Sequence, residues 1–301
     1  MASVLELTDV SFVRNGNRIL DNVSWTVDEA DRWVILGPNG AGKSTILQLA
    51  AANQHPTSGT VDLLGEWVGK VDVFELRTRI GLAATGLARR IPATERVGDV
   101  VLTAAYAVTG RWQERYESFD LERAAEVMDA WDLSALSTRT FGTLSDGERK
   151  RVQIARAVMT DPELMLLDEP AGSLDLGARE SLLQSLEDYA SSSLAPAIVM
   201  VTHHVEEIPP GFTHGMLLRD GAIVAAGPLD EVLTDARLTE TFGLPLEVRH
   251  ENGRWSARAP RCARIPRQNT SSLPRLQKKK KSCLLRGAPC RCVWFRRSLR
   301  A

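Results

Sequence analysis

Short apolar runs alternate with longer amphipathic stretches through most of the chain. Three runs of strand length, RWVILG at 32–37, ELMLLDEP at 163–170 and AIVMVTHH at 197–204, are largely apolar, which is typical of strands buried on both faces. Leu5 to Phe12 alternates in part, and GTVDLLG at 59–65 is another short run, so each predicts a further strand. Buried strands separated by helices predict an α/β fold with a mostly parallel sheet.

The pattern becomes largely helical from Phe74 to about Met159, which predicts a helical insertion in the α/β core. Within this insertion, the segment 120–133 is expected to place one apolar stripe on a helix, formed by Leu121, Ala124, Ala125, Met128 and Trp131. Further along, Asp220-Gly221 lies between apolar flanks, which predicts a β-hairpin over 217–227.

Composition places the chain among soluble globular proteins. Of its 301 residues, 44% are hydrophobic and 25% are charged, and no apolar run reaches the roughly 18 residues that a membrane span needs. The start of the chain has acidic residues and no apolar signal region, so no secretory signal is expected. These features predict a cytoplasmic protein.

Charge divides the chain into an acidic body and a basic tail. The segment 260–301 holds 13 of the 37 Lys and Arg and no acidic residue, which leaves 24 basic against 38 acidic residues before it. All four cysteines, Cys262, Cys283, Cys290 and Cys292, lie in this tail, so the body is expected to fold without disulfides. The tail is predicted to be disordered. It could contact nucleic acid or anionic lipid, although a translated extension without a role is favoured.

The stretch GPNGAGKST combines glycines with a lysine and two hydroxyls directly after a predicted strand and before a predicted helix. Glycines allow the backbone to turn its N–H groups toward an anion, and the helix N-terminus adds partial positive charge. We therefore predict a phosphate-binding loop made of Gly37, Pro38, Asn39, Gly40, Ala41, Gly42, Lys43, Ser44 and Thr45. Lys43 would reach the β- and γ-phosphates, and the Ser44 hydroxyl would bind Mg²⁺.

Two other predicted strands end in polar residues. Asp168 can hold Mg²⁺, and Glu169 beside it can act as general base toward water. His203 and His204 follow the next strand, where a histidine could contact the γ-phosphate. A metal site over 201–207 is the weaker alternative, since no further His or Cys cluster accompanies it.

The segment LSDGERKRVQIARAVM at 144–159 begins with Ser145 and Glu148 three residues apart. This spacing predicts a capping box at a helix start, which alone explains both residues. The same helix start could also bind an anion.

In this order, the motifs resemble those of the nucleotide-binding domain of the ATP-binding cassette (ABC) superfamily over residues 3–248. GPNGAGKST matches the Walker A motif, and LMLLDEP matches Walker B followed by the catalytic glutamate. LSDGE is similar to the signature LSGGQ, with Asp146 and Glu148 as variants, GSLD at 172–175 matches the D-loop, and VTHH matches the switch-histidine segment.

The resemblance implies a P-loop NTPase of ABC type, with an N-terminal antiparallel β subdomain and a helical subdomain. We expect an ATPase domain at 1–248, with its core at 1–73 and 160–248 and the helical subdomain at about 74–159, then an extension at 249–259 and the tail.

The family's mechanism also implies a dimer. Two chains would sandwich two Mg-ATP, and each nucleotide would lie between the Walker A loop of one chain and Ser145 and Gly147 of the other. Glu169 would orient water, His203 would stabilise the γ-phosphate, and Asp175 would couple the two sites. A single set of motifs cannot close a site, so the resemblance implies a homodimer.

Two positions depart from the family pattern. Arg14 occupies the place of an aromatic residue that stacks on adenine, and its guanidinium could contact the base or simply lie at the surface. Thr85 replaces the Q-loop glutamine, which senses Mg²⁺ and lies near the contact with membrane subunits.

Two functions remain in competition. The first is the ATP-binding and hydrolysing subunit of a transporter, which energises a separate membrane permease and is found in the cytoplasm or on the cytoplasmic face of the plasma membrane. The second is a regulatory or nucleic-acid-associated ATPase, which Thr85 favours. A single cassette without long coiled coils argues for the first. The transported compound and the direction of transport have no signature in the sequence.

Overall fold

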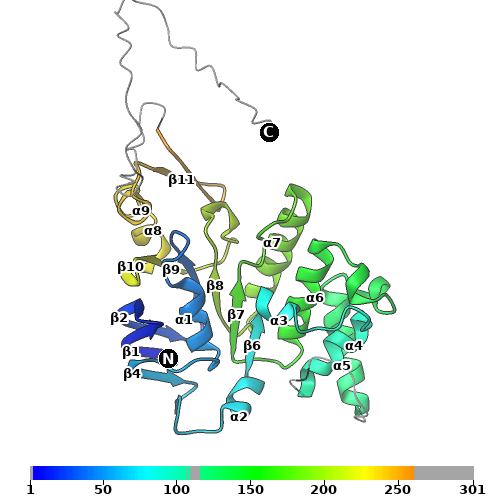
Figure 1. The fold of residues 1–301 in the computed structure, drawn as a ribbon. Coiled ribbons are helices and arrows are strands. Elements are labelled where there is room, and N and C mark those ends of the chain that lie inside the picture. The colour runs from blue at the N-terminus through cyan, green and yellow to red at the C-terminus, as the bar shows by residue number, and fades with distance from the viewer. Residues whose placement is uncertain (1–2, 107, 109–115, 261–301) are drawn as a thin grey trace, which may run out of the picture. The chain divides into compact units, whose positions relative to one another are not determined.

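The core is a six-stranded sheet whose strands lie in the order β10 (Ala222–Pro228), β9 (His214–Arg219), β3 (Arg32–Leu36), β8 (Ala197–Val201), β7 (Leu164–Asp168) and β6 (Ile80–Ala83) (Figure 1). All neighbouring pairs are parallel except β9 and β10. The computed structural model describes residues 3–106, 108 and 116–260, and they all belong to one compact unit. Most of the predicted tail, 261–301 with its cysteines, lies outside the described residues.

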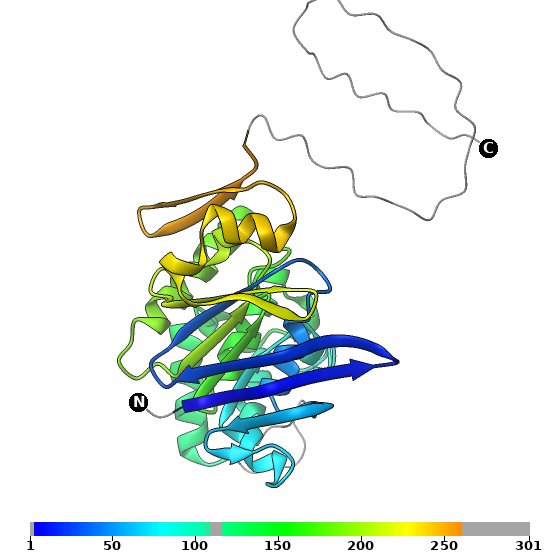
Figure 2. The ribbon, with the colours of Figure 1, turned by 90° about the vertical axis from the view of Figure 1, so that its left-hand side faces the viewer.

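A second, antiparallel sheet has the order β2 (Asn17–Asp28), β1 (Ser3–Arg14), β4 (Ser58–Leu63) and β5 (Glu66–Trp67), and its three long strands lie side by side in Figure 2. At the other end of the described chain, β11 (Glu247–Glu251) and β12 (Arg254–Arg258) form a separate hairpin.

The longer helices lie mainly between β6 and β8 in sequence, and α4, α5 and α6 group beside the β6 edge in Figure 1. The α-helices are α1 Lys43–Ala50, α2 Val73–Thr78, α3 Thr85–Ala88, α4 Val97–Leu102, α5 Ser118–Ala130, α6 Asp146–Val158, α7 Leu176–Ala190, α8 Leu229–Val232 and α9 Asp235–Phe242. The 3₁₀ helices are η1 Thr103–Tyr106, η2 Ser134–Leu136, η3 Phe141–Thr143 and η4 Val205–Glu207.

The central strands β3, β8 and β7 of the six-stranded sheet are buried on both faces, whereas the edge strand β10 is partly exposed. Trp33 and Ile35 of β3 belong to one apolar core with α1 and the antiparallel sheet, whereas Val34 and Leu36 belong to a second core with α4, α6 and α7. Successive side chains of a strand point to opposite faces, so a continuous apolar run serves both cores. This burial fixes the carboxyl ends of β3, β7 and β8 at one edge.

The structure confirms the predicted α/β class, each predicted strand and the hairpin at Asp220-Gly221, where both residues have positive φ. The predicted stripe on α5 is partly wrong. Leu121 is 51% exposed and Ala125 is exposed, while Val127 is buried beside Ala124. The strand β6 also interrupts the stretch for which the pattern indicates helix. Its Gly81 packs so tightly that an added Cβ would lie 2.5 Å from the Ala157 carbonyl oxygen of α6.

Candidate nucleotide-binding and catalytic site

The predicted phosphate loop connects β3 to α1. Gly42 has φ 105°, and a Cβ there would lie 2.9 Å from the main-chain oxygen of Ile19 on β2. A Cβ at Gly37 would lie 2.1 Å from the carbonyl oxygen of Leu218 on β9. Only glycine fits these two positions, so the loop packs directly against both sheets. At Gly40 a Cβ would meet no atom within 4 Å, which leaves that part of the loop open to a ligand.

Lys43 is 6% exposed and its Nζ points into the loop. It donates hydrogen bonds to the main-chain oxygens of Gly37 at 2.8 Å and Pro38 at 3.1 Å. Burial lowers the pKa of Lys43, while the carboxylates of Glu169 and Asp168 act in the opposite direction. A buried ammonium held by loop carbonyls is a suitable partner for phosphate oxygens.

Asp168 ends β7 next to the start of α1. The Ser44 hydroxyl donates a long hydrogen bond of 3.5 Å to its Oδ1. Burial and then the neighbouring Glu169 raise the pKa of Asp168, and Lys150, Ser44 and Lys43 oppose that rise. A hydroxyl and a carboxylate beside a phosphate loop are the hard oxygen ligands that Mg²⁺ takes together with phosphates, so these residues fit the metal.

Glu169 and His203 meet at the same edge. His203 Nδ1 lies 3.1 Å from Glu169 Oε1, and the rings of His203 and His204 have centroids 4.0 Å apart. Glu169 has φ 49°, and its N–H donates to the Val201 carbonyl at 2.9 Å. The left-handed backbone turns its side chain out of the strand direction and toward His203.

The alternative metal site over 201–207 gains no support. Glu207 turns inward and accepts a very short hydrogen bond from the Thr202 hydroxyl, and the described residues contain no group of three or more His, Cys, Asp or Glu that could hold a metal.

The signature segment forms the predicted capping box. Glu148 N–H donates to Ser145 Oγ at 3.3 Å, and Ser145 N–H donates to Glu148 Oε2 at 2.7 Å. Asp175 likewise caps α7, because its Oδ1 accepts from Ala178 N–H at 2.9 Å. A Cβ at Gly147 would contact Ala178, so these two helix starts lie together. Among the described residues, no hydrogen bond connects Ser145, Gly147 or Asp175 to the phosphate loop.

The two departures from the motif pattern lie in different parts of the fold. Arg14 is exposed at the end of β1, and the partner strand β2 packs on Gly42 through Ile19 and Leu20. Thr85 begins α3, immediately after β6.

Sequence reasoning missed Lys150 of α6, whose Nζ donates to the main-chain oxygen of Glu169 at 2.8 Å. Its place within a run of charged residues on a helix gives no signal, because the contact depends on how α6 packs against the end of β7.

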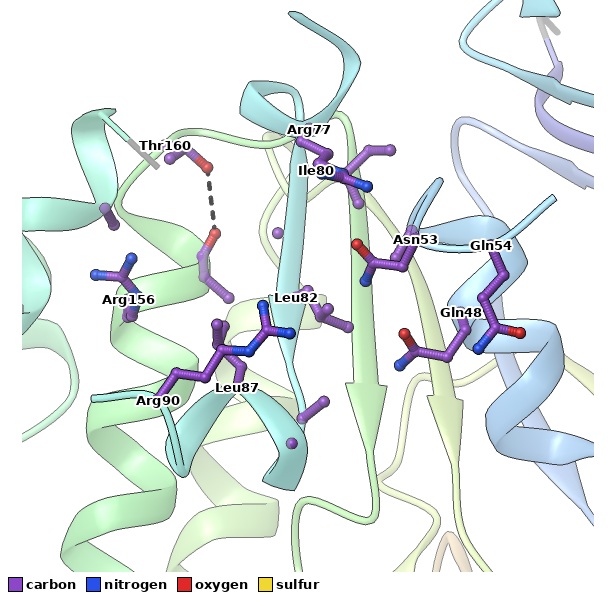
Figure 3. A pocket seen from close by; sticks show the side chains of 16 residues that line it. Gln48, Asn53, Gln54, Arg77, Ile80, Leu82, Leu87, Arg90, Arg156 and Thr160 are labelled. Carbon is purple, nitrogen blue, oxygen red and sulfur yellow. Dashed lines mark hydrogen bonds between the residues drawn. The ribbon is translucent and has the colours of Figure 1, made fainter. Parts of the chain in front are cut away.

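A pocket of about 640 Å³ lies beside β6 (Figure 3). Figure 3 shows Arg90 and Arg156 on one side of β6 and Gln48, Asn53 and Gln54 on the other. The lining of this pocket contains no Asp or Glu. Arg77 Nε and Gln54 Oε1 are buried without a hydrogen-bond partner in the described part of the chain.

The loop, the two acidic residues after β7 and the histidine after β8 define a P-loop NTPase. The family model for ABC transporters matches residues 20–172. The chain is 40% identical to the uncharacterized ABC transporter ATP-binding protein YlmA of Bacillus subtilis (strain 168), covering 81% of this chain and 93% of YlmA. The chain therefore belongs to the ABC transporter family of ATP-binding cassette proteins.

Two further proteins extend this comparison. The chain is 34% identical to the hemin import ATP-binding protein HmuV of Rhodococcus jostii (strain RHA1), with 82% of each covered. A solved ABC transporter in an inward-facing conformation superimposes with a TM-score of 0.68 at 25% identity, covering 85% of this chain and 96% of that one.

These findings confirm the predicted family, the ABC-type P-loop fold and the activity. The protein is an ATP-binding subunit of an ABC transporter and hydrolyses ATP. The alternative of a regulatory or nucleic-acid-associated ATPase has no counterpart among these relatives. No helix in the described residues is both long and apolar enough to cross a bilayer.

Proposed function

We propose that this chain binds Mg-ATP at the phosphate loop and energises import through a separate membrane permease as a homodimer. Lys43 binds the β- and γ-phosphates, and Ser44 and Asp168 bind Mg²⁺, which would supply charge neutralisation at the phosphates. Glu169 orients the attacking water as general base, and His203 contacts the γ-phosphate while its Nδ1 stays on Glu169. The 3.1 Å contact between these two side chains supports the pairing of their roles.

The homodimer follows from an incomplete site. One chain gathers Lys43, Ser44, Asp168, Glu169 and His203 at one edge of the sheet. In the described residues, Ser145 and Asp175 cap their own helices, and no hydrogen bond joins Ser145, Gly147 or Asp175 to the phosphate loop. Cassettes of this family dimerise, and a two-fold axis would bring each signature helix to the other chain's phosphate loop. This separation of the two halves is the observation that carries the proposal. Arg14 would contact the adenine base.

The experiment is complementation between two defective chains. Lys43→Met damages the phosphate half and Ser145→Ala damages the signature half. If the site forms between chains, a mixture contains heterodimers with one intact site, so ATP turnover should rise well above that of either variant alone. If both halves served the same nucleotide within one chain, mixing would restore nothing, and the proposal would fail.

The pocket beside β6 is the proposed contact with the permease. It borders α3, which begins with Thr85, and it offers Arg77 and Arg90 without any acidic lining residue. These charges would attract an acidic side chain on the permease. By binding a permease through this pocket, the protein would be held at the cytoplasmic face of the plasma membrane. The import direction is supported by the import function named for HmuV.

The pocket proposal can be tested on membranes. Arg90→Glu is expected to lower several-fold the amount of protein that co-sediments with membranes of the cells in which the protein occurs naturally, because it places like charge opposite the acidic partner. Arg89→Glu is the matched control, since Arg89 is adjacent in sequence but does not line this pocket. Equal sedimentation of both variants and the wild type would contradict the assignment.

The proposal also includes the domain boundaries that the sequence predicts. The ATPase domain at 1–248 would suffice for hydrolysis, with the extension at 249–259 and the tail at 260–301 as additions.

A further inference from the structure

The side chain of Lys150 joins two parts of the site that the sequence treats as separate. It lies half-buried on α6, five residues after Ser145, and its Nζ donates to the main-chain oxygen of Glu169 at 2.8 Å. Burial lowers the pKa of Lys150, and the carboxylates of Asp168, Glu169, Glu207 and Asp146 oppose that change by favouring the charged form. The ammonium therefore sits within an acidic environment around the catalytic glutamate.

The main chain of Glu169 is held in an uncommon conformation. Its φ is 49°, its N–H is bound to the Val201 carbonyl, and its carbonyl oxygen accepts from both Gly172 N–H at 3.2 Å and Lys150 Nζ. A left-handed conformation at a residue other than glycine is costly and persists only where several contacts enforce it. The direction of the Glu169 side chain thus depends on these contacts. Within the described part of the chain, Lys150 makes the only hydrogen bond from the signature helix to Glu169.

The start of α6 carries the signature residues. Ser145 caps the helix and Gly147 lies in its first turn. An α-helix moves nearly as a rigid rod, and five residues span only about 7.5 Å along its axis. A shift of the helix start by a bound nucleotide would therefore be transmitted to Lys150.

We propose that Lys150 is a positioning residue that links the signature half of the chain to its own catalytic glutamate. When the start of α6 engages the partner's nucleotide, Lys150 fixes the Glu169 peptide in the orientation that aims the carboxylate at water in the chain's own site. Binding at one site of the dimer thereby prepares hydrolysis at the other. This inference rests on the proposed head-to-tail dimer.

The test is steady-state hydrolysis as a function of ATP concentration, with Lys150→Met, Lys150→Arg and the wild type. Lys150→Met keeps the apolar stem but removes the donor. It should lower kcat by about 10- to 100-fold, the range expected for a hydrogen bond to a charged group, with KM changed by less than about twofold. The Hill coefficient should fall from above unity to about unity, and Lys150→Arg should restore both.

Arg151→Met is the matched control. Arg151 is adjacent on α6 and donates to Ser181 Oγ of α7 at 2.9 Å, not to Glu169. It should keep the Hill coefficient of the wild type. Lys150→Gln, measured alongside, removes the charge, and its amide ends one bond short of the Nζ position, so it should behave like Lys150→Met.

Three outcomes would overturn the inference. They are unchanged kcat and Hill coefficient in Lys150→Met or Lys150→Gln, a parallel loss in Arg151→Met, or failure of Lys150→Arg to rescue. These outcomes differ from failure of the proposed function, in which the wild type itself would show no ATP-dependent dimer on size-exclusion chromatography and no cooperativity.

Discussion

The phosphate half of the site and the signature half are built in different ways. In the first, Lys43, Asp168, Glu169 and His203 come from separate elements, and their charges and hydrogen bonds act on one another. In the second, Ser145 caps its own helix and leaves its exposed face to solvent. In the proposed function, one chain therefore supplies the groups for hydrolysis, and a second chain would supply the surface that closes the site.

The largest effect is expected from a change in the phosphate half alone. Glu169→Gln should keep ATP binding and ATP-dependent pairing, because the amide preserves size and the signature half is untouched. It should lower kcat by about a thousandfold or more, since an amide cannot act as general base. Phosphate release under single-turnover conditions and size-exclusion chromatography with Mg-ATP measure the two properties.

Glu163→Gln provides the matched control at the other end of the same strand. Glu163 directly precedes β7 and forms an ion pair with Arg79, at the end of the strand opposite Asp168. Replacing Glu163 should therefore leave kcat within about twofold of the wild-type value. Undiminished turnover in Glu169→Gln would refute the role of Glu169 and would mean that the phosphate half is not the catalytic half.

The predictability of the two halves differs for a physical reason. The phosphate loop could be located from the sequence because its glycines, lysine and hydroxyls form one continuous run that directly follows a buried strand. Asp168 and His203 could be brought together because the carboxyl ends of adjacent parallel strands share an edge.

Other features depend on tertiary packing that no local pattern encodes. The prediction for the stripe on α5 is wrong at Leu121 and Ala125, because the face that α5 packs against α4 and α6 is narrower than its apolar residues suggest. The contact of Lys150 with Glu169 arises where α6 packs against the end of β7, and the arginine-lined pocket lies where α6, α3 and β6 meet. Both become visible only in the folded chain.

The smallest effect is expected at the β11–β12 hairpin, which connects the two halves of the site through Arg254. Arg254 of β12 donates to both carboxylate oxygens of Glu180, at 3.0 and 3.3 Å, and to the main-chain oxygen of Glu206 at 3.0 Å. Glu180 lies on α7, the helix that Asp175 caps, and Glu206 lies three residues after His203. The C-terminal hairpin thereby ties the histidine segment to the helix of the signature half.

Arg254→Ala should lower the free energy of unfolding by about 1 kcal/mol, because the ion pair is partly exposed and the hydrogen bonds of Arg254 to Glu180 and Glu206 are only partly buried. Arg249→Ala is the control, since its pair with Glu251 stays within the hairpin and is well exposed. Urea unfolding measures both. If Arg254→Ala and Arg249→Ala have the same free energy of unfolding, the hairpin does not stabilise the contact between the histidine segment and α7. The position of His203 would then depend only on the packing of the core.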